Sequence, residues 1–378
     1  MHRRDRDNQL IRIKSLDGLR GIAAIGISVF CHYMYFKPQH GYPFHEYAVF
    51  FWFYDCGWTL VDFFFLLSGF VFTYVYREQI SNRTIDFRKY MVLRLSRLYP
   101  LHLATLLFIA CIQYIRTGAG FGYYAFEAND GINFLLSASL LQEVLNMPFS
   151  FNGPSWSISC EFVAYIFFFF ITIYLFKTWL YRPLLIVVIV AAITMIMMFL
   201  FNGLNFLIFN PFIARVGISF FLGSLLYDFN EYLQGSNNKS AILWLLCVVV
   251  CAAFLDYRLT RHSFLCNYWV YWVLFYSLIV FPSIILIVIN TDILSRFFSS
   301  PPLVFLGAIS YSIYLINIPV QISIDTSNVL FNLHINYSSP YFFIFYIAML
   351  LTMSSLSYTF FESKIKKTLR QVIINRKS

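Results

Sequence analysis

Long apolar runs with few charges are the feature that most constrains this chain. We find ten apolar runs, of which all but the seventh and weakest reach the roughly 17 to 25 residues that an α-helix needs to cross a bilayer. Hydrophobic residues make up 60% of the 378 residues and charged residues only 12%, about half the charged share of a soluble domain. We therefore expect an all-α integral membrane protein. The ten runs cover approximately residues 16–36, 57–76, 90–115, 155–176, 183–201, 206–229, 241–255, 268–289, 303–322 and 341–361.

The distribution of basic residues predicts an orientation. Both tails are basic, so an even number of spans with a cytoplasmic N-terminus places both in the cytoplasm. In this topology only four of the 27 Lys and Arg residues lie on the outer side, namely Lys37, Arg116, Arg258 and Arg261, as the positive-inside rule requires. The chain then divides into a basic cytoplasmic tail at 1–15, a transmembrane domain at 16–362 and a second basic cytoplasmic tail at 363–378.

The same distribution accounts for the net charge of +9. Basic residues that flank apolar runs act as orientation signals and contact anionic lipid. We therefore expect membrane lipid as a partner and no nucleic acid. The seven cysteines show no spacing typical of zinc ligands, and we expect no metal site. Cys56 and Cys266 both fall on the outer side, which leaves a disulfide between them open.

The outer loop at residues 116–154 is the longest connection. It contains a Gly/Tyr-rich stretch and then the apolar run INFLLSASLLQEVL, which is too short to cross a bilayer. We expect this run to form a re-entrant or interfacial helix. No hydrophilic stretch is long enough for an appended soluble domain, so the membrane domain must carry the function.

Ionisable residues inside the spans are few. Each is a functional candidate, because a charge within a bilayer is costly. Arginines near the start of the third span have the alternative of snorkelling to the headgroups, whereas Arg215 lies near the middle of its span, where snorkelling is difficult. The candidates are Asp17, Arg20, His32, Asp62, Arg94, Arg97, His102, Glu161 and Arg215.

Six motifs follow one another along the spans. They are LDGLRG with a histidine one span-length later, GWTLVDFFFLLSGF, FRKYMVLRLSRLYP, NGPSWSISCEF, RVGISFFLG and GAISYSIYLINIP. The ordered set, from about Ser15 to Glu362, resembles the acyltransferase-3 family of membrane acyltransferases. The resemblance implies a bacterial inner-membrane enzyme that transfers an acyl group, usually acetyl, from cytoplasmic acyl-CoA to a hydroxyl of a carbohydrate or lipid-linked glycan. Such acceptors include lipopolysaccharide O-antigen, capsule and exopolysaccharide.

Two positions depart from the family pattern. Eleven residues separate Arg20 from His32, where the family usually has ten. On a regular α-helix ten intervening residues leave two side chains about 20° apart, and eleven leave them about 120° apart. Three explanations stay open: a π-bulge near Gly26 to Ser28 absorbs the extra residue, the two residues act in different compartments, or Cys31 replaces the histidine. We favour His32, because imidazole is a general base near neutral pH. The second departure is Asn317, where many relatives have histidine, which argues against proton transfer at this position.

Acyl transfer from a thioester to a hydroxyl needs a base and cations for the phosphates of CoA. We predict that His32, Asp62 and Glu161, from three helices, converge on one level near the outer surface as catalytic groups. Acyl-CoA is expected as a donor substrate, and no tightly bound cofactor is expected. The predicted donor contacts are Arg20, Arg88, Arg94, Arg97, Arg215, Ser310 and Tyr311.

The partner of Arg215 decides between several arrangements. Glu161, Asp62 and a CoA phosphate are all candidates, and we predict that Glu161 and Arg215 are coupled, directly or through substrate. The alternative function is a proton-coupled secondary transporter, with Asp62, Glu161 and Arg215 as a relay and His32 as a gate. It is not favoured, because the two halves of the chain show no correspondence of the kind that transporter repeats show.

Overall fold

The computed structural model describes residues 13–45, 47–203, 209–236, 245–249, 251, 269–365 and 368. Its regular elements are all helices in these ranges, so the predicted all-α fold is confirmed. Nine helices among the described residues are long and apolar enough to cross a membrane. Each corresponds to one predicted run, and the remaining run, at 241–255, lies largely outside the described residues, as does Cys266.

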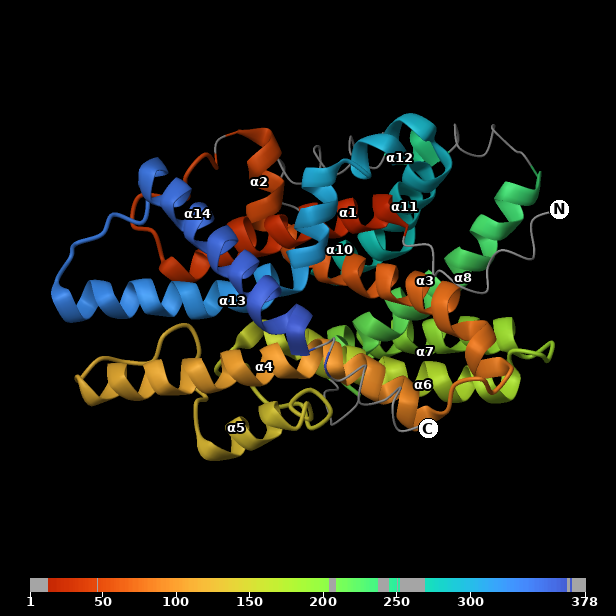
Figure 1. Ribbon diagram of the computed structural model, residues 1–378, viewed down its shortest axis with the longest axis horizontal. Coiled ribbons are helices and arrows are strands. Elements are labelled where there is room, and N and C mark those ends of the chain that lie inside the picture. The colour runs from red at the N-terminus through yellow and green to blue at the C-terminus, as the bar shows by residue number, and fades with distance from the viewer. Residues whose placement is uncertain are drawn as a thin grey trace.

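Most of the long helices run roughly along the longest axis of the molecule, and others cross it obliquely (Figure 1). Short helices connect them or continue them. In chain order the α-helices are α1 (Lys14–Ile25), α2 (Ala48–Asp55), α3 (Leu60–Ser81), α4 (Phe87–Gly118), α5 (Gly131–Ala138), α6 (Trp156–Leu175), α7 (Tyr181–Asn202), α8 (Pro211–Ser236), α10 (Trp269–Phe275), α11 (Phe281–Asn290), α12 (Asp292–Phe298), α13 (Pro301–Phe331) and α14 (Pro340–Ser357).

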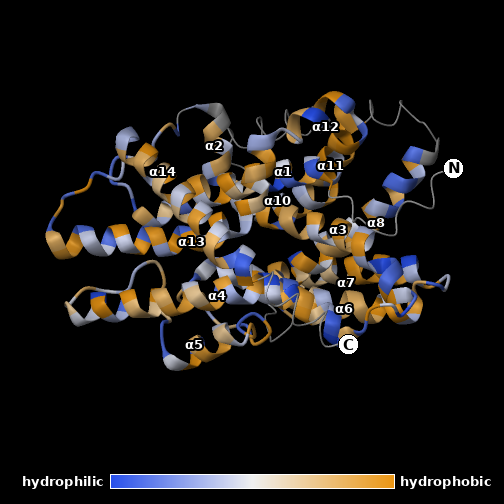
Figure 2. Cartoon of the chain, viewed as in Figure 1, coloured by the Kyte–Doolittle hydropathy of each residue, from blue (hydrophilic) through white to orange (hydrophobic). Residues whose placement is uncertain are grey.

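The apolar surface fits a lipid surrounding. The most apolar 18-residue stretch of α7 has a mean hydropathy of 3.1, yet only 22% of this stretch is buried within the protein. A helix this apolar and this exposed is stable where lipid is the solvent. In α3, by contrast, 72% of the corresponding stretch is buried, which makes it a central helix. Hydrophobic residues, coloured orange, occur along most of each long helix in Figure 2.

Glycines allow the central helices to approach closely. A Cβ atom at Gly21 of α1 would lie 2.7 Å from the backbone nitrogen of Gly307 in α13, and one at Gly69 of α3 would lie 1.8 Å from the carbonyl oxygen of Phe220 in α8. Small residues at such crossings are typical of membrane helices, where van der Waals packing drives association. The contacts fix α1 against α13 and α3 against α8.

The loop between α4 and α6 enters the bundle. The Asn152 side chain donates to the Leu315 carbonyl (3.1 Å), near the middle of α13, and to Thr105 Oγ1 (3.0 Å), near the middle of α4. His102 Nε2 lies 2.8 Å from the carbonyl oxygen of Ser137 in α5. The predicted short helix is present as α5, and Asn152 in the segment after it contacts the middle of α4 and α13, so α6 begins within the bundle rather than at its end. Whether α5 is re-entrant or interfacial stays a prediction.

Glu143 is a carboxylic acid buried in this loop. It is only 1% exposed, and its backbone carbonyl accepts a hydrogen bond from the Asn210 side chain (2.7 Å). Burial raises the pKa of Glu143 from 4.5 to about 8. Between these values the folded protein holds a proton that the unfolded chain has released. The stability that this group contributes is therefore complete below pH 4.5 and is lost as the pH rises through about 8.

We expect the wild-type protein in detergent to lose thermal stability between about pH 5.5 and pH 8.5, and Glu143→Gln to lose markedly less, because the amide has no proton to release. Melting curves at several pH values would measure the difference. Glu127→Gln, in an exposed position of the same loop, is the matched control. Equal pH dependence in wild type and Glu143→Gln would contradict the prediction.

Candidate active site

His32 follows an irregular stretch of the first membrane span. A π-helix, Gly26–Phe30, and then a 3-10 helix, Cys31–Phe36, continue α1. A π-helix takes one more residue into its turn than an α-helix. The predicted π-bulge is therefore present between Arg20 and His32. Cys31 is buried whereas His32 is partly exposed, and this difference favours His32 as the reactive side chain.

Side chains of α13 hold His32 in place. Asn317 Oδ1 lies 3.2 Å from His32 Nδ1. One turn further along α13, Gln321 Nε2 donates to the backbone carbonyl of His32 (3.1 Å) and to the Tyr346 hydroxyl (2.9 Å). His32 is thus fixed both at its ring and at its backbone by one helix.

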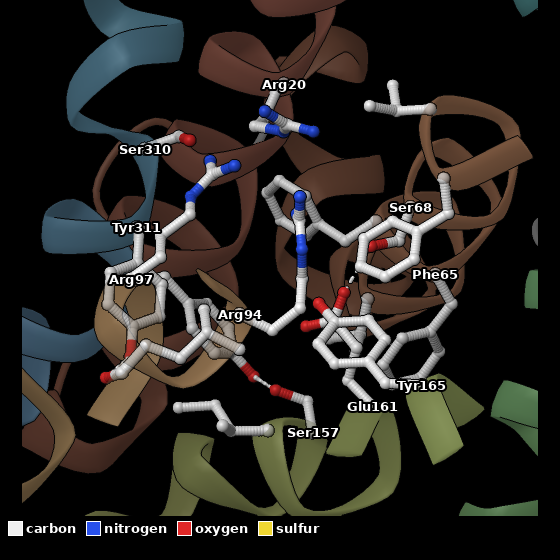
Figure 3. Close-up of a pocket in the computed structure, with 17 residues that line it drawn as sticks. Arg20, Phe65, Ser68, Arg94, Arg97, Ser157, Glu161, Tyr165, Ser310 and Tyr311 are labelled. Atoms are coloured by element: carbon white, nitrogen blue, oxygen red, sulfur yellow. Dashed lines mark hydrogen bonds between the residues drawn. The ribbon is translucent and has the colours of Figure 1, made fainter. Parts of the chain in front are cut away.

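An arginine-lined cavity lies among α1, α3, α4, α6 and α13 (Figure 3). Arg20 comes from α1, and Arg94 and Arg97 come from α4. The Arg94 guanidinium lies 4.4 Å from the ring centroid of Phe72 and 4.1 Å from that of Tyr76, so cation–π contacts hold it in place. The polar residues lining the cavity are Arg20, Ser68, Arg94, Arg97, Ser157, Glu161, Tyr165, Ser310, Tyr311 and Tyr314.

The charges of this cavity are predominantly positive. Among its lining residues, Glu161 is the one carboxylate beside three arginines. Asp17 lies 3.7 Å from Arg20, on the same helix. A cavity with this balance suits an anionic ligand with more than one negative charge.

Glu161 belongs to the arginine-lined cavity. Its carboxylate accepts a hydrogen bond from the Ser68 hydroxyl (Figure 3). The predicted convergence of Glu161 with His32 near the outer surface is therefore wrong, because Glu161 lines a cavity that His32 does not line. The physical reason is the loop before α6. Its contacts place the start of α6 near the middle of α4 and α13, so Glu161 lies deeper in the bundle than it would if α6 began at the end of the bundle.

Tyr314 connects the cavity with His32. It lines the cavity, and its ring centroid lies 6.1 Å from that of His32 and 6.2 Å from that of Phe64. Its hydroxyl donates to the Pro154 carbonyl (2.9 Å) and lies 3.0 Å from Ser157 Oγ. Tyr314 is therefore held by the start of α6, between the arginines and the imidazole.

Asp62 and Arg215 form a buried ion pair outside the cavity lining. Arg215 Nε lies 3.0 Å from Asp62 Oδ1 and Arg215 Nη2 lies 2.9 Å from Asp62 Oδ2. The Trp58 and Trp156 rings lie 5.2 and 5.0 Å from the guanidinium carbon. Of the three partners weighed for Arg215, the structure has Asp62, and a direct pair with Glu161 is wrong.

The remaining predicted donor contacts differ in position. Arg88 is exposed near the start of α4 and does not line the cavity. Ser310 and Tyr311 do line it, although the Ser310 hydroxyl donates to the Gly307 carbonyl (2.9 Å) and the Tyr311 hydroxyl to the Leu98 carbonyl. Both hydroxyls thus already have acceptors in the backbone.

The sequence reasoning missed several contacts. It did not anticipate that Asn317 and Gln321 contact His32, nor that Ser68 and Tyr165 share a cavity with Glu161. The one available signal was Asn317, because the expected histidine is absent there. A helical pattern shows that these residues share a face with other polar residues, but it does not show which helices meet.

Comparison with known proteins places this geometry in a family. The acyltransferase domain of the acyltransferase-3 family matches residues 13–359. The chain is 33% identical to Acyltransferase MdmB of Streptomyces mycarofaciens over 167 residues, which are 42% of this chain and 38% of that protein. It is 29% identical to Protein 2 in picA locus of Rhizobium radiobacter over 164 residues, 39% of this chain and 76% of that protein.

No solved structure matches the chain. The chain spans well under half the length of the Streptomyces relative. The family match, in contrast, covers all nine spanning helices almost completely, and the Streptomyces relative is itself named an acyltransferase. On this basis the chain belongs to the acyltransferase-3 family.

Proposed function

We propose that this enzyme transfers an acyl group, with acetyl as the expected one, from cytoplasmic acyl-CoA to a hydroxyl of a cell-surface carbohydrate. The observation that carries the proposal is the position of Tyr314, which lies between the arginine-lined cavity and His32. One continuous site can then hold the phosphates of CoA at one end and present the thioester toward a base at the other.

The donor end is formed by Arg20, Arg94 and Arg97. Guanidinium groups bind phosphate through charge-assisted, often bidentate hydrogen bonds. These three guanidinium groups suit the 3′-phosphate and pyrophosphate of an acyl-CoA that enters from the cytoplasmic side. The apolar lining residues Phe64 and Phe65 suit the thinner pantetheine arm, which would extend past Tyr314.

The reaction end is formed by His32. Its imidazole takes the proton of the acceptor hydroxyl, whose oxygen then attacks the thioester carbonyl carbon. When the tetrahedral intermediate collapses, the C–S bond breaks and the proton passes from His32 to the leaving thiolate of CoA. The sequence places His32 about 18 Å beyond Arg20 along a regular helix, so the acceptor would meet the acyl group toward the outer side.

The two acidic groups take different parts in this scheme. Glu161, inside the cavity, balances part of the arginine charge and thereby orients the cations toward the donor. Asp62 is proposed to hold Arg215 and so to brace α3 against α8, rather than to exchange protons with substrate. These assignments revise the predicted catalytic role of Asp62 and the predicted donor role of Arg215.

The proposal places the enzyme in the bacterial inner membrane with both tails in the cytoplasm, as the distribution of basic residues favours. Its acceptor would be a lipid-linked glycan or surface polysaccharide, such as O-antigen, capsule or exopolysaccharide. Mass spectrometry of the surface glycans with and without the gene tests this. Loss of one acyl group per repeating unit supports the proposal, and an unchanged acylation pattern contradicts it.

Variants of the donor end give a sharper test. Arg94→Gln and Arg97→Gln should each raise the KM for acyl-CoA by about 10- to 150-fold, since one charge-assisted hydrogen bond contributes about 1.5 to 3 kcal/mol. The KM for acceptor should change little. Transfer of labelled acetyl in membrane vesicles measures both constants. Arg88→Gln, exposed and outside the cavity, is the matched control, and equal effects in all three variants would assign these arginines to the membrane surface.

A further inference from the structure

We propose that Asn317 is a positioning residue that fixes the tautomer and the direction of the His32 ring, so that Nε2 is the atom that accepts the proton. The inference rests on the proposed function of His32 as the base. It goes beyond that function by assigning the reacting nitrogen and the group that selects it.

The orientation of the Asn317 amide is set by its own hydrogen bonds. Asn317 Nδ2 donates to the Tyr314 carbonyl and lies 3.4 Å from Ser28 Oγ. With the nitrogen engaged on that side, the amide oxygen faces the imidazole, and Oδ1 lies 3.2 Å from His32 Nδ1. A carbonyl oxygen only accepts hydrogen bonds, so Nδ1 must carry the hydrogen. In the neutral ring the lone pair then lies on Nε2.

Other residues hold the backbone around His32, so the ring is the part that Asn317 fixes. In the π-helix the Ser28 carbonyl accepts from the Tyr346 hydroxyl (2.9 Å), and the His32 carbonyl accepts from Gln321 (3.1 Å). Gln321 in turn accepts from the hydroxyl of Tyr124 in the loop between α4 and α6 (3.2 Å). These contacts hold the main chain, and the contact with Asn317 sets the ring upon it.

The surroundings of the ring give the amide a defined chemical role. In the described part of the chain, Asn317 Oδ1 is the hydrogen-bonding atom that contacts the imidazole. The titratable groups facing the ring are Tyr314 from α13 and Tyr35 from its own segment, with ring centroids at 6.1 and 5.8 Å, and Cys31 precedes it. An amide accepts the Nδ1 hydrogen but cannot remove it. The proton gained at Nε2 therefore stays on the imidazole until the thiolate takes it.

Two substitutions separate positioning from packing. Asn317→Leu removes the acceptor, whereas Asn317→Asp keeps an oxygen at the same place. We expect Asn317→Leu to lower kcat about 100-fold, the lower end of the range for a general-base contribution because the imidazole itself remains, with the KM for acyl-CoA unchanged. Asn317→Asp should retain kcat within about 10-fold of wild type. The matched control is Asn328→Leu, an asparagine on the same helix that bonds Tyr337 and the Ile335 backbone.

Nitrogen NMR of histidine-labelled enzyme reads the tautomer directly, with the His32 signals identified by their loss in His32→Gln. We expect the Nδ1–H tautomer in wild type and a mixture of both tautomers in Asn317→Leu. A kcat in Asn317→Leu no lower than in Asn328→Leu, or an unchanged tautomer, would overturn the inference. Full activity of His32→Gln would instead contradict the proposed function of His32, and the tautomer measurement keeps these two failures apart.

Discussion

His32→Ala is expected to lower kcat by about 1000-fold or more, because it removes the general base and the group that returns the proton to the thiolate. The protein should remain in the membrane, and its KM for acyl-CoA should stay near the wild-type value, since His32 does not line the arginine-lined cavity. Labelled acetyl transfer in vesicles, normalised to the amount of enzyme, measures the effect.

Two further variants give this experiment its controls. His40→Ala changes an exposed histidine of the following loop, whose hydrogen bond to Ser338 is made by the backbone, and should leave kcat unchanged. Cys31→Ala tests the alternative that Cys31, which has the usual spacing of ten intervening residues from Arg20, takes the role of the histidine. Substantial transfer by His32→Ala together with loss in Cys31→Ala would show that the base is assigned to the wrong residue.

Substitution of either partner of the Asp62–Arg215 pair is expected to cause the largest loss of stability. Removing one partner leaves the other charge buried and unpaired, so Asp62→Asn and Arg215→Gln should each lower the free energy of unfolding in detergent by about 3 to 5 kcal/mol. The double variant should be more stable than the sum of the two losses implies, by about 1 kcal/mol or more. Denaturation of the purified variants measures this coupling.

An ion pair whose arginine is exposed is the control for this cycle. Arg182 lies 3.0 Å from Asp228, but its side chain is 70% exposed, so Arg182→Gln should lose at most about 1 kcal/mol. Added acyl-CoA should still stabilise the Arg215 variant, because the pair lies outside the cavity lining. If the losses in the free energy of unfolding were strictly additive, the assigned pairing would be contradicted. If acyl-CoA no longer stabilised the Arg215 variant, Arg215 would be a donor contact after all.

The sequence was most informative about the membrane spans. Length and hydropathy predict a helical membrane protein, since an unpaired backbone is costly in lipid. The apolar run in the loop between α4 and α6 was recognisable because it is too short to cross. The conflict between Arg20 and His32 is visible as an angle on a helical wheel, and a π-helix, Gly26–Phe30, lies between the two residues.

Contacts between helices were harder to predict. Counting residues from the ends of helices gives the wrong depth for Glu161, because α6 begins inside the bundle. The pairing of Arg215 with Asp62 depends on how α3 packs against α8, and a helical repeat carries no information about which face meets which neighbour. Asn317 is recognisable as a missing histidine, but its contact with His32 depends on how α13 packs against the first membrane span.

The most direct test of the central claim is a structure of the enzyme with a thioether analogue of acetyl-CoA, which binds as the donor does but cannot transfer its acyl group. We predict that the phosphates contact Arg20, Arg94 or Arg97 and that the acyl carbonyl lies past Tyr314, on the side facing His32 Nε2. Phosphates bound elsewhere, or an acyl end that stays among the arginines without reaching the histidine, would contradict the account.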